Sequence, residues 1–188
     1  MLLDTFLPQA DFQEFHAIRI HSPAEKVFQS IKNVTITELP LTRTLMRIRM
    51  LPARLSGDRS RFLAIDRPLV SWAANSGLIL AEDAGHEMVF GIIGQFWKAS
   101  GGLLATPPGI GEFLAFQQAG FAKAATNFYL SEGTGANETR LSTETRIQAL
   151  DGATRRKFGW YWRLIQPGSA FIRREWLNAV KKRAESEK

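Results

Sequence analysis

Acidic, basic and hydroxyl side chains that could bind a ligand or transfer a proton alternate in one strand-like stretch. Glu144 and Arg146 alternate with Thr143 and Thr145, and alternate side chains of a β-strand point to opposite faces. If the Glu144 face lines a cavity, Glu144 is a catalytic acid with Arg146 as its partner, or the two hold a polar ligand group. If that face meets solvent, they are a surface ion pair that contributes well under ~1 kcal/mol. The apolar residues of the strand favour the Thr143 and Thr145 face as the inner one.

Two further side chains are candidates for chemistry in such a cavity. Lys123 stands in an otherwise apolar strand-like stretch. Facing a cavity it would bind an acidic ligand or form a Schiff base, whereas an outward lysine buries only its stem. Tyr161 is the third candidate for proton transfer, beside Glu144 and Arg146.

Metal, thiol and nucleotide chemistry have no motif in the sequence. The chain has no cysteine, and His16, His21 and His86 stand in separate elements without ligand spacing, so we expect no metal site. The stretch GIIGQFW matches neither a P-loop nor a nucleophile elbow nor a dinucleotide fingerprint. We therefore expect no cofactor.

Aromatic side chains are the expected wall of an apolar cavity. Aromatic residues distributed in this way along strands and a helix also form ordinary cores. Where a sheet wraps around a helix, the core and the cavity wall are the same surface. With the two threonines and the lysine above, they complete the predicted ligand-binding set: Phe90, Trp97, Phe116, Lys123, Phe128, Thr143, Thr145, Phe158 and Trp162.

The elements that position these residues are organised around a long helix predicted over residues 151–184. Its apolar face repeats at intervals of three and four: Phe158, Trp162, Ile165, Ser169, Ile172, Trp176 and Val180. Asp151-Gly152 predicts the helix start. Pro167-Gly168 predicts a kink or a break, with Ser169 as a cap of the second half.

The residues before this helix alternate like strands and could wrap around it. Residues 1–12 read as a loosely ordered arm, and residues 60–75 give no clear pattern. Gly91 and Gly94 interrupt one long strand, where glycine marks a bend, a bulge or a close approach. Helices are predicted from Ser22-Pro23 to Asn33 and over 36–51, and strands over 14–21, 78–82, 87–97, 112–117, 121–131 and 138–149.

This order predicts an α+β fold in which antiparallel strands carry helices on one face. It resembles the START-like superfamily, also called SRPBCC or Bet v 1-like, which includes polyketide cyclase/dehydrase-type proteins. The resemblance rests on SPAEKVFQSI after the first strand and on TRLSTETRIQAL running into DGATRRKFGWYWRLIQPGSAFIRREWL. These motifs resemble a branch whose members mostly lack an assigned function.

The resemblance implies one domain over residues 1–188 with a helix-grip fold. In that fold a curved antiparallel sheet wraps around a long C-terminal helix, and two short helices follow the first strand. Family members bind lipids, sterols, polyketides or plant metabolites, and some catalyse cyclisation or dehydration. The expected function is therefore binding of a small apolar or amphipathic ligand between sheet and helix. The alternatives are a cyclase- or dehydratase-like enzyme, and an interaction protein with a basic surface.

The net charge of +6 comes largely from two basic clusters. Neither is interleaved with aromatic residues in a nucleic-acid motif, so we interpret both as solvated faces and do not expect nucleic acid as a partner. No apolar run reaches the ~20 residues of a membrane span, and no secretory signal is seen. We expect a cytoplasmic monomer or homodimer. The clusters are Arg43, Arg47, Arg49, Arg54, Arg59 and Arg61, and Arg155, Arg156, Lys157, Arg163, Arg173, Arg174, Lys181, Lys182 and Arg183.

Overall fold

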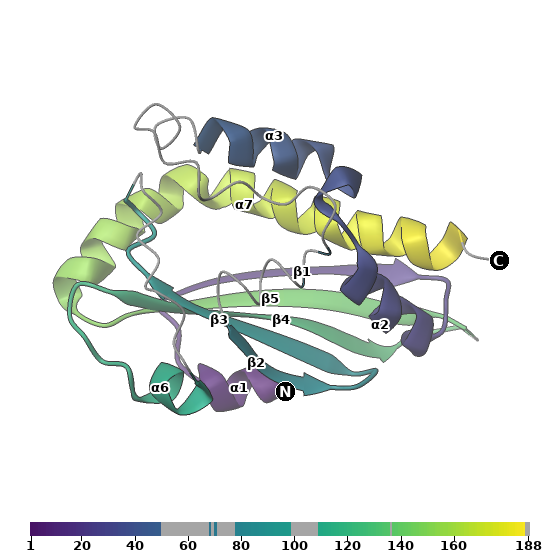
Figure 1. Ribbon diagram of the computed structural model, residues 1–188, viewed down its shortest axis with the longest axis horizontal. Helices are drawn as coiled ribbons and strands as arrows, with labels where there is room; N and C mark the ends of the chain where they lie inside the picture. Colours follow the sequence, from purple (N-terminus) through teal and green to yellow (C-terminus); the bar gives the residue numbers. More distant parts are fainter. Residues whose placement is uncertain (50–67, 69, 71–77, 99–108, 136, 187–188) are drawn as a thin grey trace.

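A five-stranded antiparallel sheet with a long C-terminal helix on one face forms the described part of the protein (Figure 1). The computed structural model describes residues 1–49, 68, 70, 78–98, 109–135 and 137–186. The helices are α1 (Leu2–Phe6), α2 (Ala24–Asn33), the 3-10 helix η1 (Ile36–Glu38), α3 (Pro40–Arg49), α6 (Ile110–Ala115) and α7 (Gly152–Ser186). The strands are β1 (Phe12–Ile20), β2 (Leu78–Asp83), β3 (Glu87–Gly94), β4 (Ala122–Glu132) and β5 (Thr139–Ala149).

The strands lie in the order β1-β5-β4-β3-β2. The four strands β2 to β5 are neighbours in sequence and in space, whereas β1 pairs with the last strand, β5. Gly85 has φ of +83° in the turn between β2 and β3, a left-handed conformation that glycine adopts without a Cβ clash. The α+β class and two helices after β1 are as the sequence predicts, but the single helix predicted over 36–51 is divided at Leu39 into η1 and α3. Of residues 60–75 only Pro68 and Val70 are described, and Arg54, Arg59 and Arg61 lie outside the described residues.

Helix α7 begins at an aspartate cap and continues without a break through Pro167. The Asp151 carboxylate accepts hydrogen bonds from Thr154 N at 2.8 Å and from Gly120 N at 2.6 Å. Hydrogen bonds from the Thr154 hydroxyl and these amides hold the pKa of Asp151 well below its usual range. Of the two alternatives predicted at Pro167-Gly168, the break is wrong, as is the cap by Ser169, and the helix bends instead (Figure 1). Proline has no N–H to donate to the backbone carbonyl four residues earlier, but Pro167 is exposed, so water can reach that carbonyl. Figure 1 shows α7 curving over the sheet.

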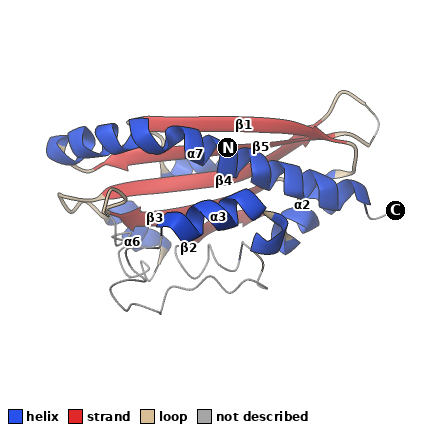
Figure 2. Cartoon of the chain, turned by 90° about the horizontal axis from the view of Figure 1, so that it is seen from above, coloured by secondary structure: helices blue, strands red, loops and turns tan. Residues whose placement is uncertain are grey.

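Apolar side chains cover both faces of the sheet, so the predicted arrangement with helices on one face is wrong. Seen edge-on, α7 and α3 lie above the sheet and α1 and α6 below it (Figure 1), and Figure 2 shows α7 running along the strands. The core toward α7 includes Ile20, Ile31, Phe128, Leu141, Trp176 and Val180. The core on the opposite face includes Leu3, Leu7, Leu80, Val89, Ile93 and Phe113.

Two predicted elements differ because of this second core. The predicted strand over 112–117 is wrong, since the chain forms α6 there and buries Phe113 against the sheet. A Cβ at Gly91 would lie 2.9 Å from Phe113 Cε2 and 2.7 Å from Leu80 Cδ1. Only a glycine at this position leaves room for the side chains of Phe113 and Leu80. The loose arm predicted for residues 1–12 is also wrong, because Leu3 and Leu7 are buried and α1 forms.

Candidate functional site

Polar side chains gather between α7 and the sheet, in a layer that is otherwise apolar. Alternation along each strand points every second side chain toward α7. The register places Glu14 opposite Thr145, and Thr145 opposite Thr126. Helix α7 contributes Ser169 and Arg173 from its sheet-facing side. We call this group the polar cluster, and its members are Glu14, His16, Thr126, Thr143, Thr145, Ser169 and Arg173.

Glu14 is the centre of the polar cluster. It is 7% exposed, and burial of a carboxylate is costly unless its oxygens are bonded. Its Oε1 lies 2.8 Å from His16 Nε2, and its Oε2 accepts a hydrogen bond from Ser169 Oγ at 2.6 Å. A histidine oriented by a buried carboxylate is an arrangement that can accept and return a proton.

The other part of the polar cluster combines two hydroxyls with a guanidinium. Thr126 Oγ1 and Thr145 Oγ1 are 3.0 Å apart, and an Arg173 Nη2 donates to Thr126 Oγ1 at 3.3 Å. Desolvation lowers the pKa of Arg173, and the negative charge of Glu14 acts in the opposite direction. The layer therefore presents a carboxylate from the sheet and a cation from α7.

Two buried polar atoms of this layer have no hydrogen-bond partner among the described residues: Thr143 Oγ1 and Trp176 Nε1. Thr143 is 1% exposed and Trp176 is 9% exposed. Both residues adjoin Phe128, because Thr143 is its register partner on β5 and the ring of Trp176 lies 4.9 Å from its ring. Buried polar groups are almost always paired, so unpaired ones need an explanation.

Most of the predicted aromatic wall lies in this layer. Phe90 and Phe128 pack with Trp176 over the middle of the sheet. Phe158 and Trp162 stack at the other end with ring centroids 5.8 Å apart. Trp97, in the turn after β3, meets Phe158 edge to face at 6.4 Å.

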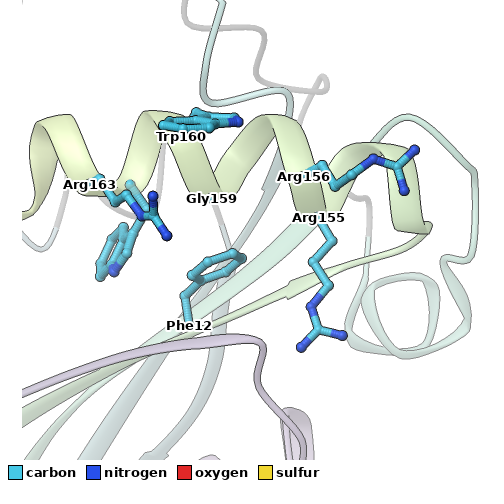
Figure 3. Close-up of a pocket in the computed structure, with 7 residues that line it drawn as sticks. Phe12, Arg155, Arg156, Gly159, Trp160 and Arg163 are labelled. Atoms are coloured by element: carbon cyan, nitrogen blue, oxygen red, sulfur yellow. The ribbon is translucent and has the colours of Figure 1, made fainter.

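A hollow of about 430 Å³ opens beside the aromatic end of the layer, a volume within the usual range of small-molecule sites. Figure 3 shows Phe12 of β1 below Gly159, with Arg155 reaching down toward the strand. Arg155 Nε bonds Asp11 Oδ1 at 3.1 Å. The lining residues are Phe12, Arg155, Arg156, Gly159, Trp160, Trp162 and Arg163.

Two members of the predicted ligand-binding set lie on the opposite face of the sheet. Lys123 is 4% exposed, and its Nζ donates to the carbonyls of Phe113 at 3.4 Å and Leu114 at 3.3 Å, in the last turn of α6. Desolvation lowers the pKa of Lys123. Phe116 packs edge to face on Phe121, with ring centroids 5.6 Å apart, in the same second core.

The predicted catalytic candidates Glu144 and Arg146 also face away from α7. Arg146 Nε donates to Glu144 Oε1 at 2.5 Å, and an Arg146 Nη1 donates to Asp4 Oδ1 of α1 at 2.7 Å. Burial alone would lower the pKa of Arg146, but the hydrogen bonds to the two carboxylates outweigh it and raise the pKa. This is a part-buried ion pair that attaches α1, and it has no access to the layer under α7.

Glu87 completes this attachment of α1. Its carboxylate accepts hydrogen bonds from the backbone N–H groups of Leu2 at 2.7 Å and Leu3 at 3.2 Å, and from Asn127 Nδ2 at 2.7 Å. Asn127 Oδ1 in turn accepts from Glu144 N at 2.9 Å. We call the group Asp4, Glu87, Asn127, Glu144 and Arg146 the α1 clasp.

Tyr161 alone of the three predicted catalytic residues packs in the layer of α7. It is half-buried, and its ring lies 5.7 Å from that of Phe158. Sequence reasoning missed Glu14, His16 and Arg173 as members of a site. The available signal was the alternation of β1, which places Glu14 and His16 on the same face as the buried Ile20.

No protein-family model and no curated protein matches the chain. No metal-binding group of three or more His, Asp or Glu side chains occurs in the described part of the chain. Among the described helices, none is long and apolar enough to cross a membrane. The candidate site is therefore defined by its own geometry.

Proposed function

We propose that the protein binds a small amphipathic ligand between the sheet and α7, as a START-like protein with a helix-grip fold. The observation that carries this proposal is the pair of unpaired buried groups, Thr143 Oγ1 and Trp176 Nε1. An indole N–H can only donate, whereas a hydroxyl both donates and accepts. Each of them could therefore be satisfied by an oxygen of a ligand carbonyl, hydroxyl or carboxylate group.

The surroundings of these two groups suit an amphipathic molecule. The rings of Phe90, Phe128 and Trp176 offer apolar surface, and Arg173 offers a positive charge beside them. Binding sites of this kind are mostly apolar with a few polar groups that orient the ligand. The order of elements, with two helices after β1 and a long last helix, supports the helix-grip assignment.

Native mass spectrometry of protein purified from its own host tests this proposal directly. We expect a bound molecule that is retained under native conditions and released on denaturation. Thr143→Val should reduce the retained fraction, whereas Thr145→Val should not, because the Thr145 hydroxyl already bonds Thr126. Absence of any bound molecule from wild-type protein counts against the proposal, as does equal retention by wild type and the Thr143 variant.

Acid–base catalysis on the same ligand is the second candidate, and the 2.8 Å contact between Glu14 and His16 favours it. In this reaction His16 would take a proton from one atom of the ligand and return it to another, an isomerisation that needs no further reactant, while the Glu14 carboxylate stabilises the imidazolium. A molecule that co-purifies with the His16→Gln variant should then be converted on incubation with wild-type protein, and further incubation with the variant should leave it unchanged. Recovery of the molecule unchanged favours a binding protein.

A further inference from the structure

The side of α7 that faces away from the sheet carries exposed apolar side chains in a row. They recur at helical intervals of four, three and four: Trp160, Leu164, Pro167 and Phe171. Trp160 is 73% exposed, Leu164 81% and Phe171 58%. Single exposed apolar residues are ordinary, but a contiguous row of large ones marks an interaction surface. We call this row the α7 stripe.

The α7 stripe is flanked by positive charges of its own helix, and the first carboxylate that follows it, Glu175, accepts hydrogen bonds from Leu41 N at 2.8 Å and Thr42 N at 2.7 Å of α3. Between Gly152 and Arg174 the helix has no aspartate or glutamate. The exposed cations of this segment are Arg155, Arg156, Lys157, Arg163 and Arg174. An apolar row flanked by cations is complementary to a partner that has a negatively charged surface and an apolar interior just beneath it.

Tryptophan and arginine are arranged at the stripe as in side chains that sit at a lipid headgroup layer. The guanidinium of Arg163 lies over the ring of Trp160, 5.1 Å from its centroid. Figure 3 shows Trp160 on the side of α7 away from Phe12, with Arg156 and Arg163 at successive turns beside it. Tryptophan is enriched at this depth of a bilayer because its ring is apolar and its N–H is polar.

We propose that the α7 stripe docks reversibly on the surface of an anionic phospholipid bilayer. The apolar residues enter the headgroup boundary, and the flanking cations contact lipid phosphates, as in other interfacial helices. A second copy of the chain fits less well, since a two-fold interface would place arginine opposite arginine. Nucleic acid would use the cations but leaves Leu164 and Phe171 without a contact.

Cosedimentation with vesicles tests the docking surface, with a matched pair of variants. Phe171 and Phe15 are 58% and 51% exposed, but Phe15 lies on the face of β1 directed away from α7. Wild type should bind vesicles of phosphatidylcholine with phosphatidylglycerol, and not phosphatidylcholine alone. Phe171→Ser should lower partitioning about tenfold, because the variant lacks the exposed phenylalanine surface that would be buried in the bilayer. Phe15→Ser should bind like wild type.

Salt and competing partners complete the experiment. Raising ionic strength from about 0.1 M to about 1 M shortens the Debye length from about 10 Å to about 3 Å, so binding should weaken severalfold. The proposal is overturned if Phe171→Ser and Phe15→Ser bind alike. It is also overturned if sedimentation velocity shows a wild-type dimer that Phe171→Ser dissociates, or if duplex DNA binds tightly and Phe171→Ser leaves vesicle binding unchanged.

Discussion

The unpaired hydroxyl of Thr143 should lower the stability of the ligand-free protein. A substitution that removes this hydroxyl should therefore raise the free energy of unfolding. Thr143→Val replaces the hydroxyl by a methyl group of nearly the same size and keeps the β-branched shape that strands favour. Phe128, the register partner of Thr143, packs against Trp176. The new methyl therefore meets apolar surface, and no partner atom is left unpaired by the change.

The size of the gain follows from the desolvation of a buried hydroxyl. Thr143 is 1% exposed and has no partner among the described residues. An unsatisfied buried hydroxyl costs about 1–3 kcal/mol, so Thr143→Val should raise the free energy of unfolding by about 1–2 kcal/mol. For a chain of this size the melting temperature should rise by about 3–6 °C.

Urea unfolding followed by circular dichroism measures this change, and Thr145→Val is its control. Thr145 lies two residues away on the same face of β5 and is 7% exposed, but its hydroxyl is 3.0 Å from that of Thr126. Loss of a paired hydroxyl should lower the free energy of unfolding by about 1 kcal/mol. The two variants should therefore shift the urea midpoint in opposite directions at an unchanged slope.

A loss of stability in Thr143→Val, equal to that in Thr145→Val, would refute the reasoning. It would mean that the Thr143 hydroxyl has a partner in solution, such as a buried water. The ligand-bound protein offers a second comparison. If a ligand oxygen pairs with Thr143 Oγ1, the variant should be more stable than wild type without the ligand and gain less from its addition.

Two further predictions concern the α1 clasp and the helix cap. Glu87→Ala leaves the amides of α1 and the side chain of Asn127 unpaired, so the free energy of unfolding should fall by about 3 kcal/mol. Limited proteolysis of this variant should then cleave within residues 1–11 before it cleaves within the sheet. If residues 1–11 of the variant resist the protease as well as those of wild type, the α1 clasp does not hold α1 in place. Asp151→Ala should lower the melting temperature at neutral pH. Because the folded pKa of Asp151 is depressed, its stabilisation is complete above about pH 4 and disappears as the pH falls toward the folded value. The difference between variant and wild type should therefore narrow below about pH 4, and a constant difference in melting temperature would argue against the cap.

The periodicity of the sequence was sufficient to predict α7, the α+β class and most strands. Spacings of three and four run from Phe158 to Val180, and alternation along β5 predicts that Thr143 and Thr145 face the helix. These are local signals, because each depends only on the backbone repeat of one element. The same local logic gives β1 its inward residues.

The second core was missed because its elements are short. Helix α6 buries only Phe113, so its residues do not show the repeat of a longer helix. Without α6, the carbonyls that accept from Lys123 could not be foreseen, so the sequence left open whether that lysine faces a cavity or points outward. The contact of Ser169 with Glu14 depends on the position of α7 along the strands, and the sequence repeat within one helix does not specify that position.

The pairing of β1 with β5 has a consequence for the order of folding. Both strands contribute to the polar cluster, but every other strand of the sheet lies between them in sequence. During synthesis β1 must wait for nearly all the rest of the sheet before its partner exists, and such distant contacts close slowly. Until β5 is made, β1 has no strand to pair with and its backbone N–H and C=O groups stay open to other chains, so nascent protein should depend on chaperones more than the stability of the finished fold suggests.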